Sequence, residues 1–295
     1  MMRGSNVRMW SIVLVVAACG PSTSVQEAAA PPAPPEPPPG APAPGLVAAA
    51  APPAQAACVD EPGMVYIAGG DYVSERYQKT YPVPAFWIDR TEVTVAAFRA
   101  FVEAGYSPPQ IPSGRSTYLV CTWQLPDADN LPINCLNGYQ QEAFCLWAGK
   151  RLPTAPEWGW AAQGREERRR YPWGDALPSC ELAVIGIDRD RNLIGCGRNQ
   201  PWPVGSKPTD MTRDGVLDMM GNLGEPTSTG RTEGDEQSTR IIRGTSWATR
   251  AFASSRVDQH GGFAVREAWS DNTGIRCAKN AGSLPPCARA SNRAP

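Results

Sequence analysis

The sequence is poor in the residues that carry most redox and metal chemistry. Its 295 residues include a single histidine, His260, so a metal site built from three histidines is excluded. A lone histidine is most often a surface residue. The cysteines include no Cys-x-x-Cys pair, which argues against structural zinc and against a thioredoxin-like dithiol. Neither sign of charge is in excess, because 28 lysines and arginines balance 29 aspartates and glutamates. We therefore expect no nucleic-acid partner.

The N-terminus lacks an apolar run long enough to cross a membrane, yet it has the features of an export signal. Two arginines precede a short apolar run at 9–18, and small residues then lead to Cys19. This pattern resembles a bacterial lipobox, so residues 1–19 are predicted to be a lipoprotein signal peptide that ends in the lipidated Cys19. The chain would then be exported and lipid-anchored to the cell envelope, and Gly20 favours the outer membrane. Ordinary signal cleavage or an uncleaved anchor is the alternative.

Aromatic and β-branched residues are almost absent from 20–57, which consists largely of proline and alanine. Such a segment cannot bury enough apolar surface to offset its ordering entropy, so we expect a disordered tether. Residues 58–287 are long enough to form one domain with its own core, since 42% of the chain is hydrophobic. Residues 288–295 are expected to be a disordered tail.

The segment from Gly149 to Asp175 carries the clearest helix signal. Thr154 precedes Glu157 by three residues, which predicts a capping box, and Pro156 is tolerated in the first turn. We expect a helix over 155–163. Further elements are predicted as a helix between Thr94 and Gly105, a helix over 139–148, and strands at 64–72, 85–89 and 240–243.

Six segments, in the same order, resemble those of the formylglycine-generating enzyme family, also called the sulfatase-modifying factor family. They are 86–94 (FWIDRTEVT), 143–149 (AFCLWAG), 150–174 (KRLPTAPEW followed by YPWG), 204–222 (VGSKPTDMTRDGVLDMMGN), 243–247 (RGTSW) and 273–278 (TGIRCA). The resemblance runs from Gly63 to Ala278. It implies an α+β fold related to C-type lectins, with much irregular structure and disulfide bonds.

Eight cysteines remain besides Cys19, an even number in an exported chain, which predicts four disulfides. The sequence alone allows 105 connectivities. The resemblance implies one of the bonds, Cys145 with Cys277. The simplest remaining pairs are Cys180 with Cys196, Cys121 with Cys135, and Cys58 with Cys287.

A second absence bears on catalysis. The family's formylglycine-forming enzymes use two cysteines five positions apart, and two thiolates suit Cu(I). Between Cys196 and Cys277 this chain has no cysteine, and the corresponding region offers only the hydroxyls of Thr249, Ser254 and Ser255. We therefore expect no copper site and no catalytic residues. An iron-dependent branch of the family needs three histidines and is excluded as well.

Calcium is the one cofactor that the resemblance leaves available. The family binds a structural calcium ion through an asparagine, neighbouring backbone carbonyls and a glutamate, which here are Asn222, Leu223 and Glu225. The two tryptophans of the family's segment are missing at this point. Residues Asp188, Asp190 and Asn192 resemble half of an EF-hand loop, although a plain acidic turn is the alternative.

Two classes of function follow. The first is a non-catalytic binding module, in which a groove near Trp247, Ser254, Ser255, Arg256 and His260 recognises a protein, peptide or glycan. The second is a family enzyme, an oxidoreductase acting on a protein or peptide with altered chemistry. The missing cysteines favour the binding module.

Overall fold

The computed structural model describes residues 59–109, 120–186, 194–232, 234–249, 255–283 and 286–287. All of them belong to the compact unit that runs from Ala54 to Pro295. The predictions made at Cys19, at 20–57, at Cys58 and at 288–295 fall outside these residues. In the described ranges, no helix is both long and apolar enough to span a membrane.

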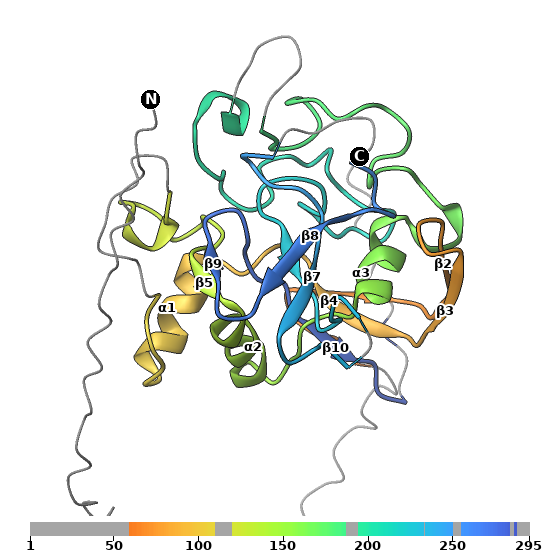
Figure 1. Ribbon diagram of the computed structural model, residues 1–295, viewed down its shortest axis with the longest axis horizontal. Coiled ribbons are helices and arrows are strands. Elements are labelled where there is room, and N and C mark those ends of the chain that lie inside the picture. The colour runs from red at the N-terminus through yellow and green to blue at the C-terminus, as the bar shows by residue number, and fades with distance from the viewer. Residues whose placement is uncertain are drawn as a thin grey trace, which may run out of the picture. The chain divides into compact units, whose positions relative to one another are not determined.

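The described residues form four small antiparallel sheets in place of one large sheet (Figure 1). The first contains β1 (Met64–Ile67), β4 (Phe86–Asp89) and β10 (Ala278–Asn280), with β4 in the centre. The second is the hairpin of β2 (Gly70–Ser74) and β3 (Lys79–Val83), and the third pairs β5 (Leu136–Asn137) with β9 (Trp269–Ser270). The fourth contains β6 (Glu225–Pro226), β7 (Thr239–Arg243) and β8 (His260–Val265).

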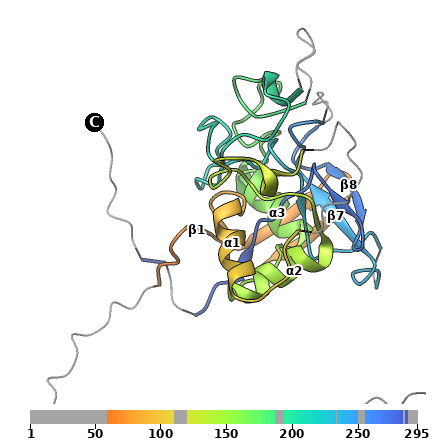
Figure 2. The same cartoon turned by 90° about the vertical axis from the view of Figure 1, so that its left-hand side faces the viewer.

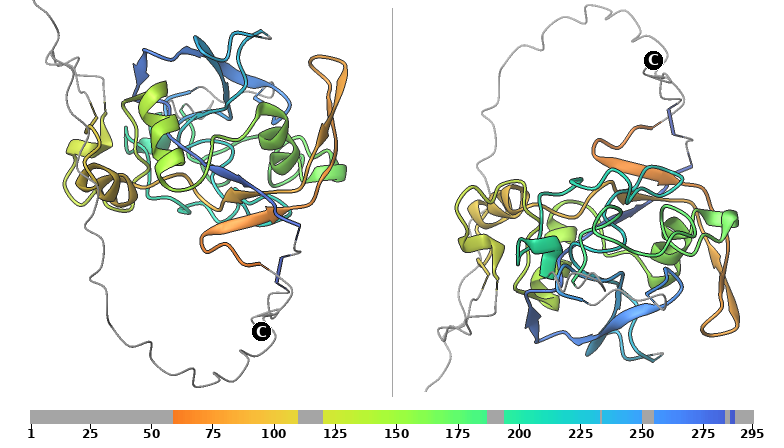
Figure 3. Two further views of the ribbon diagram at one scale, coloured as in Figure 1. Left: turned by 90° about the horizontal axis from the view of Figure 1, so that it is seen from below. Right: turned by 90° about the horizontal axis from the view of Figure 1, so that it is seen from above.

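One strand was predicted over 64–72, but the structure divides it into β1 and β2. The chain leaves the first sheet at Ala68, whose carbonyl accepts a hydrogen bond from the Trp160 indole at 2.8 Å. The same ring packs over Gly70, where an added Cβ would lie 2.3 Å from it. The break therefore lets Trp160 lie against the backbone, and the β2–β3 hairpin projects at the edge of the domain (Figures 1 and 3).

The helices confirm the predicted capping signals. Helix α1 (Val95–Glu103) is capped by Thr94, and α3 (Ala155–Ala162) begins with the predicted capping box of Thr154 and Glu157. Helix α2 (Gly138–Trp147) has a second capping box that was not predicted, formed by Asn137 and Gln140. Short 3-10 turns lie at η1 (Thr122–Gln124), η2 (Arg165–Glu167) and η3 (Ile194–Gly197).

The core of the described residues consists of three hydrophobic clusters. Helix side chains contribute to the two larger ones. Trp158 of α3 is fully buried in the first cluster, which contains β1 and β4 side chains. Helices α1 and α2 lie side by side (Figure 2), and Phe98 stacks on Phe144 with ring centroids 5.7 Å apart in the second. The third cluster is Val184, Leu223 and Trp247.

Three predicted disulfides are present: Cys121–Cys135, Cys145–Cys277 and Cys180–Cys196. Cys287 is disulfide-bonded too. The Cys145–Cys277 bond joins α2 to the segment before β10 across 132 residues. Closing so long a loop stabilises the fold by roughly 4–5 kcal/mol in chain-entropy models.

Arg276 is the most highly connected side chain of the domain and is fully buried. Its guanidinium donates to the Glu225 carboxylate at 2.7–2.9 Å, to the Asp89 carbonyl at 2.8 Å and to the Leu217 carbonyl at 2.8 Å. The Glu225 carboxylate also accepts from the Trp158 indole at 2.6 Å. One ion pair therefore connects β4, β6, α3 and the segment before β10.

We expect Glu225→Gln and Arg276→Met each to lower the free energy of unfolding by about 3–5 kcal/mol, because each leaves a buried charge unpaired. The double variant Glu225→Gln with Arg276→Met carries neither charge and should lose clearly less than the sum of the single losses. Denaturant unfolding in the presence of a calcium chelator measures all of these. Strictly additive losses would contradict the coupling.

Candidate functional site

Three polar side chains meet between the segment after β7 and the segment after β9, and we call them the hydroxyl cluster: Ser246, Thr249 and Asn272. The Ser246 and Thr249 hydroxyl oxygens lie 2.7 Å apart, and the Ser246 hydroxyl donates to the Asn272 side-chain oxygen at 3.3 Å. Ser246 is buried whereas Thr249 is exposed. The cluster thus presents a hydroxyl at the surface, supported by a buried one.

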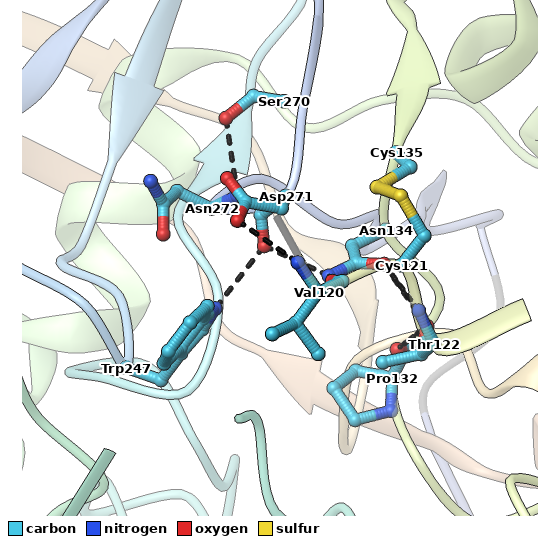
Figure 4. The surroundings of a disulfide bond; sticks show 10 residues. All are labelled: Val120, Cys121, Thr122, Pro132, Asn134, Cys135, Trp247, Ser270, Asp271 and Asn272. Carbon is cyan, nitrogen blue, oxygen red and sulfur yellow. Dashed lines mark hydrogen bonds between the residues drawn. A yellow bond between two sulfur atoms is a disulfide. The ribbon is translucent and has the colours of Figure 1, made fainter. Parts of the chain in front are cut away.

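The Cys121–Cys135 disulfide lies in the network that holds this cluster in place (Figure 4). The fully buried Asn134, next to Cys135, donates to the Asp271 carbonyl at 2.8 Å. The same carbonyl accepts from the Trp247 indole at 3.1 Å, and Asp271 precedes Asn272 of the cluster. Burial raises the pKa of the Asp271 carboxyl, which accepts from the Val120 backbone N–H at 3.3 Å. The cluster therefore rests on a rigid frame.

Among the described residues, no hydrogen-bond partner of Ser246 is a base that would activate it as a nucleophile. Ser246 contacts the hydroxyl of Thr249 and the amide of Asn272, and neither group is a base at neutral pH. Alcohol oxygens are also poor ligands for Cu(I). In the described part of the chain, the cluster can donate and accept hydrogen bonds to a ligand.

Two of the residues predicted to line one groove, Trp247 and Arg256, have different neighbours in the structure. Trp247 is buried against Val184 and Leu223, whereas Arg256 donates to Glu75 of the region after β2 at 2.7 Å. The groove as a whole stays a prediction, because residues 250–254 lie outside the described residues. The remaining predicted residues are Ser255, which is half-buried, His260, which opens β8, and Ser254, which lies outside the described residues.

Four buried carboxyl groups form a second polar centre beneath the surface, which we call the acid cluster: Glu92, Asp210, Asp218 and Glu225. The Glu92 carboxylate accepts from the Leu223 backbone N–H and from the Asn222 side chain, both at 2.8 Å. Asp218 accepts from the Gly205 backbone N–H at 2.5 Å. One oxygen of Asp210 has no hydrogen-bond partner among the described residues.

The acid cluster holds more negative charge than its surroundings neutralise. Arg276 is the cation that bears on all four groups. Burial, followed by the charge of Asp218, raises the pKa of Glu92 and of Asp210 well above the usual range. Burial also raises the pKa of Asp218 to about 6. Some of these carboxyls are therefore protonated near neutral pH unless a cation replaces the proton.

The predicted calcium ligands lie in this centre but have protein partners. Glu225 bonds Arg276, and the Asn222 side-chain oxygen accepts from the Trp202 backbone N–H at 2.9 Å. The donor set, all oxygen and rich in carboxylate, fits a hard cation in charge and chemistry. Over the described ranges, however, no three acidic, histidine or cysteine side chains are arranged to hold a metal. Calcium remains a prediction, and Asp188, Asp190 and Asn192 lie outside the described residues.

Three members of the acid cluster were not predicted: Glu92, Asp210 and Asp218. Glu92 lies in the segment FWIDRTEVT, and the two aspartates lie in 204–222. Their positions in segments that resemble the family could therefore have marked them as candidate site residues. Their convergence depends on tertiary contacts between segments 130 residues apart, such as the hydrogen bond from Asn222 to Glu92. Ser246 and Asn272 of the hydroxyl cluster were missed for the same reason.

Comparison with known proteins identifies enzymes and an inactive relative. A hercynine oxygenase from Mycolicibacterium thermoresistibile is 33% identical over 227 residues, which covers 60% of this chain and 47% of that protein. An "inactive C-alpha-formylglycine-generating enzyme 2" from Mus musculus is 35% identical over 158 residues, covering 52% of this chain and 50% of that one. The chain spans about half the length of these curated relatives.

Among solved structures, PvdO from Pseudomonas aeruginosa has a TM-score of 0.60 at 20% identity, over 76% of this chain and 97% of that one. This likeness shows a shared fold. Residues 49–281 match the family described as the sulfatase-modifying factor enzyme 1-like domain. The expected α+β fold with much irregular structure is thereby confirmed, and the chain belongs to this family.

Proposed function

We propose that this chain is a non-catalytic recognition module of the family, lipid-anchored to the envelope of a bacterial cell. The observation that carries the proposal is the complete absence of cysteine between Cys196 and Cys277. Without two thiolates the chain cannot hold Cu(I), and a single histidine cannot replace them. The relative named inactive is consistent with a family domain that persists without this activity.

The hydroxyl cluster is the part of the surface that we assign to recognition. Trp247 fixes its frame through hydrogen bonds to Asp271 and Asn222, and Thr249 is exposed at its rim. Hydroxyl and amide groups on a fixed frame suit ligands that both donate and accept hydrogen bonds, such as a peptide backbone or a glycan.

A copper-binding comparison tests the loss of catalysis. We expect the oxidised wild-type chain to retain no Cu(I) and to form no aldehyde on a peptide containing Cys-x-Pro-x-Arg. The variant Thr249→Cys with Ser254→Cys restores two thiols five positions apart and should retain Cu(I), while Thr249→Ser is the matched control. Competition with a colorimetric Cu(I) chelator and mass spectrometry of the peptide provide the measurements. Aldehyde formed by the wild-type chain above a no-protein control would refute the proposal.

Calcium is proposed as a structural ion beside the acid cluster, at the residues that the family resemblance implies, Asn222, Leu223 and Glu225. In chelator, the raised pKa of Asp218 means that the folded state holds a proton which the unfolded state releases near pH 4. The contribution of Asp218 to the free energy of unfolding is therefore fully present below about pH 4 and is lost as the pH rises to about 6. The free energy of unfolding falls by about 3 kcal/mol across this range.

We expect calcium to raise the unfolding midpoint more at pH 7 than at pH 5, because the ion replaces the missing protons. Asp218→Asn should flatten the pH dependence in chelator and weaken the calcium response, since it removes one charge and keeps an acceptor for Gly205. Thermal unfolding at both pH values, with calcium and with chelator, measures this. A midpoint indifferent to calcium at either pH would exclude a calcium ion beside the acid cluster.

The proposed anchor depends on Cys19. We expect Cys19→Ser to block acylation and to move the protein from the membrane fraction to the soluble one, because the signal then has no thiol to lipidate. Fractionation with immunoblotting measures the distribution, and Ser22→Ala is the matched control. Membrane association that survives the loss of Cys19 would favour an uncleaved anchor instead.

A further inference from the structure

We propose that the groove between β3, β10 and the start of α3 binds an extended, uncharged peptide segment of a partner protein, which pairs with the free edge of β10. The groove has a volume of about 610 Å³. It shares no residue with the hydroxyl cluster, so this proposal does not rest on the proposed function.

The hydrogen-bond pattern of β10 defines the free edge. Cys277 accepts from the Asp89 N–H at 2.9 Å and Ala281 donates to the Ala85 carbonyl at 3.3 Å, so these alternate residues face β4. Ala278 faces the other way and exchanges both of its backbone bonds with Arg151, at 2.7 and 2.8 Å. In an antiparallel strand, the residues that follow at every second position face the same side as Ala278.

Those following residues are Asn280 and Gly282, and both are exposed. Apart from the ladder with β4, no hydrogen bond joins the backbone N–H or C=O of either one to another described residue. The strand segment that would continue alongside them stops at Arg151, because the preceding Gly149 takes a left-handed φ of 70° at the end of α2. Asn280, the last residue of β10, therefore presents an unused donor and acceptor at this edge, and Gly282 beyond the strand presents a second pair.

The groove beside this edge has largely apolar walls. Tyr81, Pro82 and Pro84 form one side, and Pro156 and Thr229 form the other. A smaller cavity of about 50 Å³ continues the groove past Tyr81, Pro156 and Thr229 towards Tyr72 and Tyr77. Alternate side chains of a strand paired with β10 would point into such a groove, as in other complexes that add a strand to a sheet edge.

The two charged side chains that line the groove neutralise each other, which disfavours a peptide with a charged side chain at this position. Arg151 and Glu157 are the charged residues of the lining, and they bond each other twice, at 2.6 and 2.7 Å. Arg151 also donates to the Asn280 side chain at 2.6–2.8 Å, which leaves the guanidinium well satisfied. A charged ligand side chain would lose water there without gaining a counter-ion. Natural sheet edges are commonly protected by a charge or a proline, and Asn280 and Gly282 supply neither.

Selection with a random decapeptide library, displayed on phage, tests the proposal on the full chain. Counter-selection uses Ala281→Arg, which fills the groove, and Ser283→Arg is the matched control outside the lining. The consensus peptide is then synthesised with a fluorophore, and its affinity is measured by anisotropy. We expect an uncharged consensus whose affinity falls at least about fivefold in Ala281→Arg and changes little in Ser283→Arg.

A second measurement does not depend on how well a variant folds. N-methylation of the consensus peptide at alternate residues removes the N–H groups that face β10 and should abolish binding to the wild-type chain. Hydrogen exchange at the Gly282 amide should slow when the unmodified peptide binds. The proposal is overturned if no peptide is enriched, if Ala281→Arg binds equally well, or if the methylated or an all-proline peptide binds as tightly.

Discussion

The domain depends on one buried ion pair, Arg276 with Glu225. The strands of the described residues are only two to six residues long. Hydrogen bonds between such short strands cannot by themselves fix the positions of the segments relative to one another. The planar guanidinium bonds two backbone carbonyls and a carboxylate at once, which fixes direction as well as distance. Replacing such a pair by apolar residues often leaves stability unchanged. Its role here is to select one arrangement of loops that hydrophobic contact alone would leave ambiguous.

Local signals in the sequence predicted local structure well. The capping box at Thr154 and Glu157 required only residues within one turn, and α3 begins where it predicted. The strand expected over 64–72 failed because the determining contact, Trp160 against Gly70, spans ninety residues. Disulfide pairing lies between these cases: the residues alone left 105 connectivities, and the resemblance supplied the Cys145–Cys277 pair that the structure contains.

The candidate site was predictable in composition but not in geometry. The missing thiols could be read directly from the chain, whereas the contact of Ser246 with Asn272 joins segments 26 residues apart. Of the predicted groove, the structure describes Trp247 and Arg256, which contact different neighbours, and the groove itself stays a prediction. The sequence therefore shows which residue types are missing, and tertiary structure was needed to find which polar groups converge.

The hydroxyl cluster and the buried ion pair are built from different residues. Ser246, Thr249 and Asn272 contact neither Arg276 nor Glu225 through any hydrogen bond of the described residues. The hydroxyl cluster takes its position from Asn134, Asp271 and the Cys121–Cys135 bond. Reactive groups could thus be lost at the surface while the buried ion pair kept the segments in register. This separation is what the proposed recognition module requires, because its surface can vary while the buried ion pair keeps the fold.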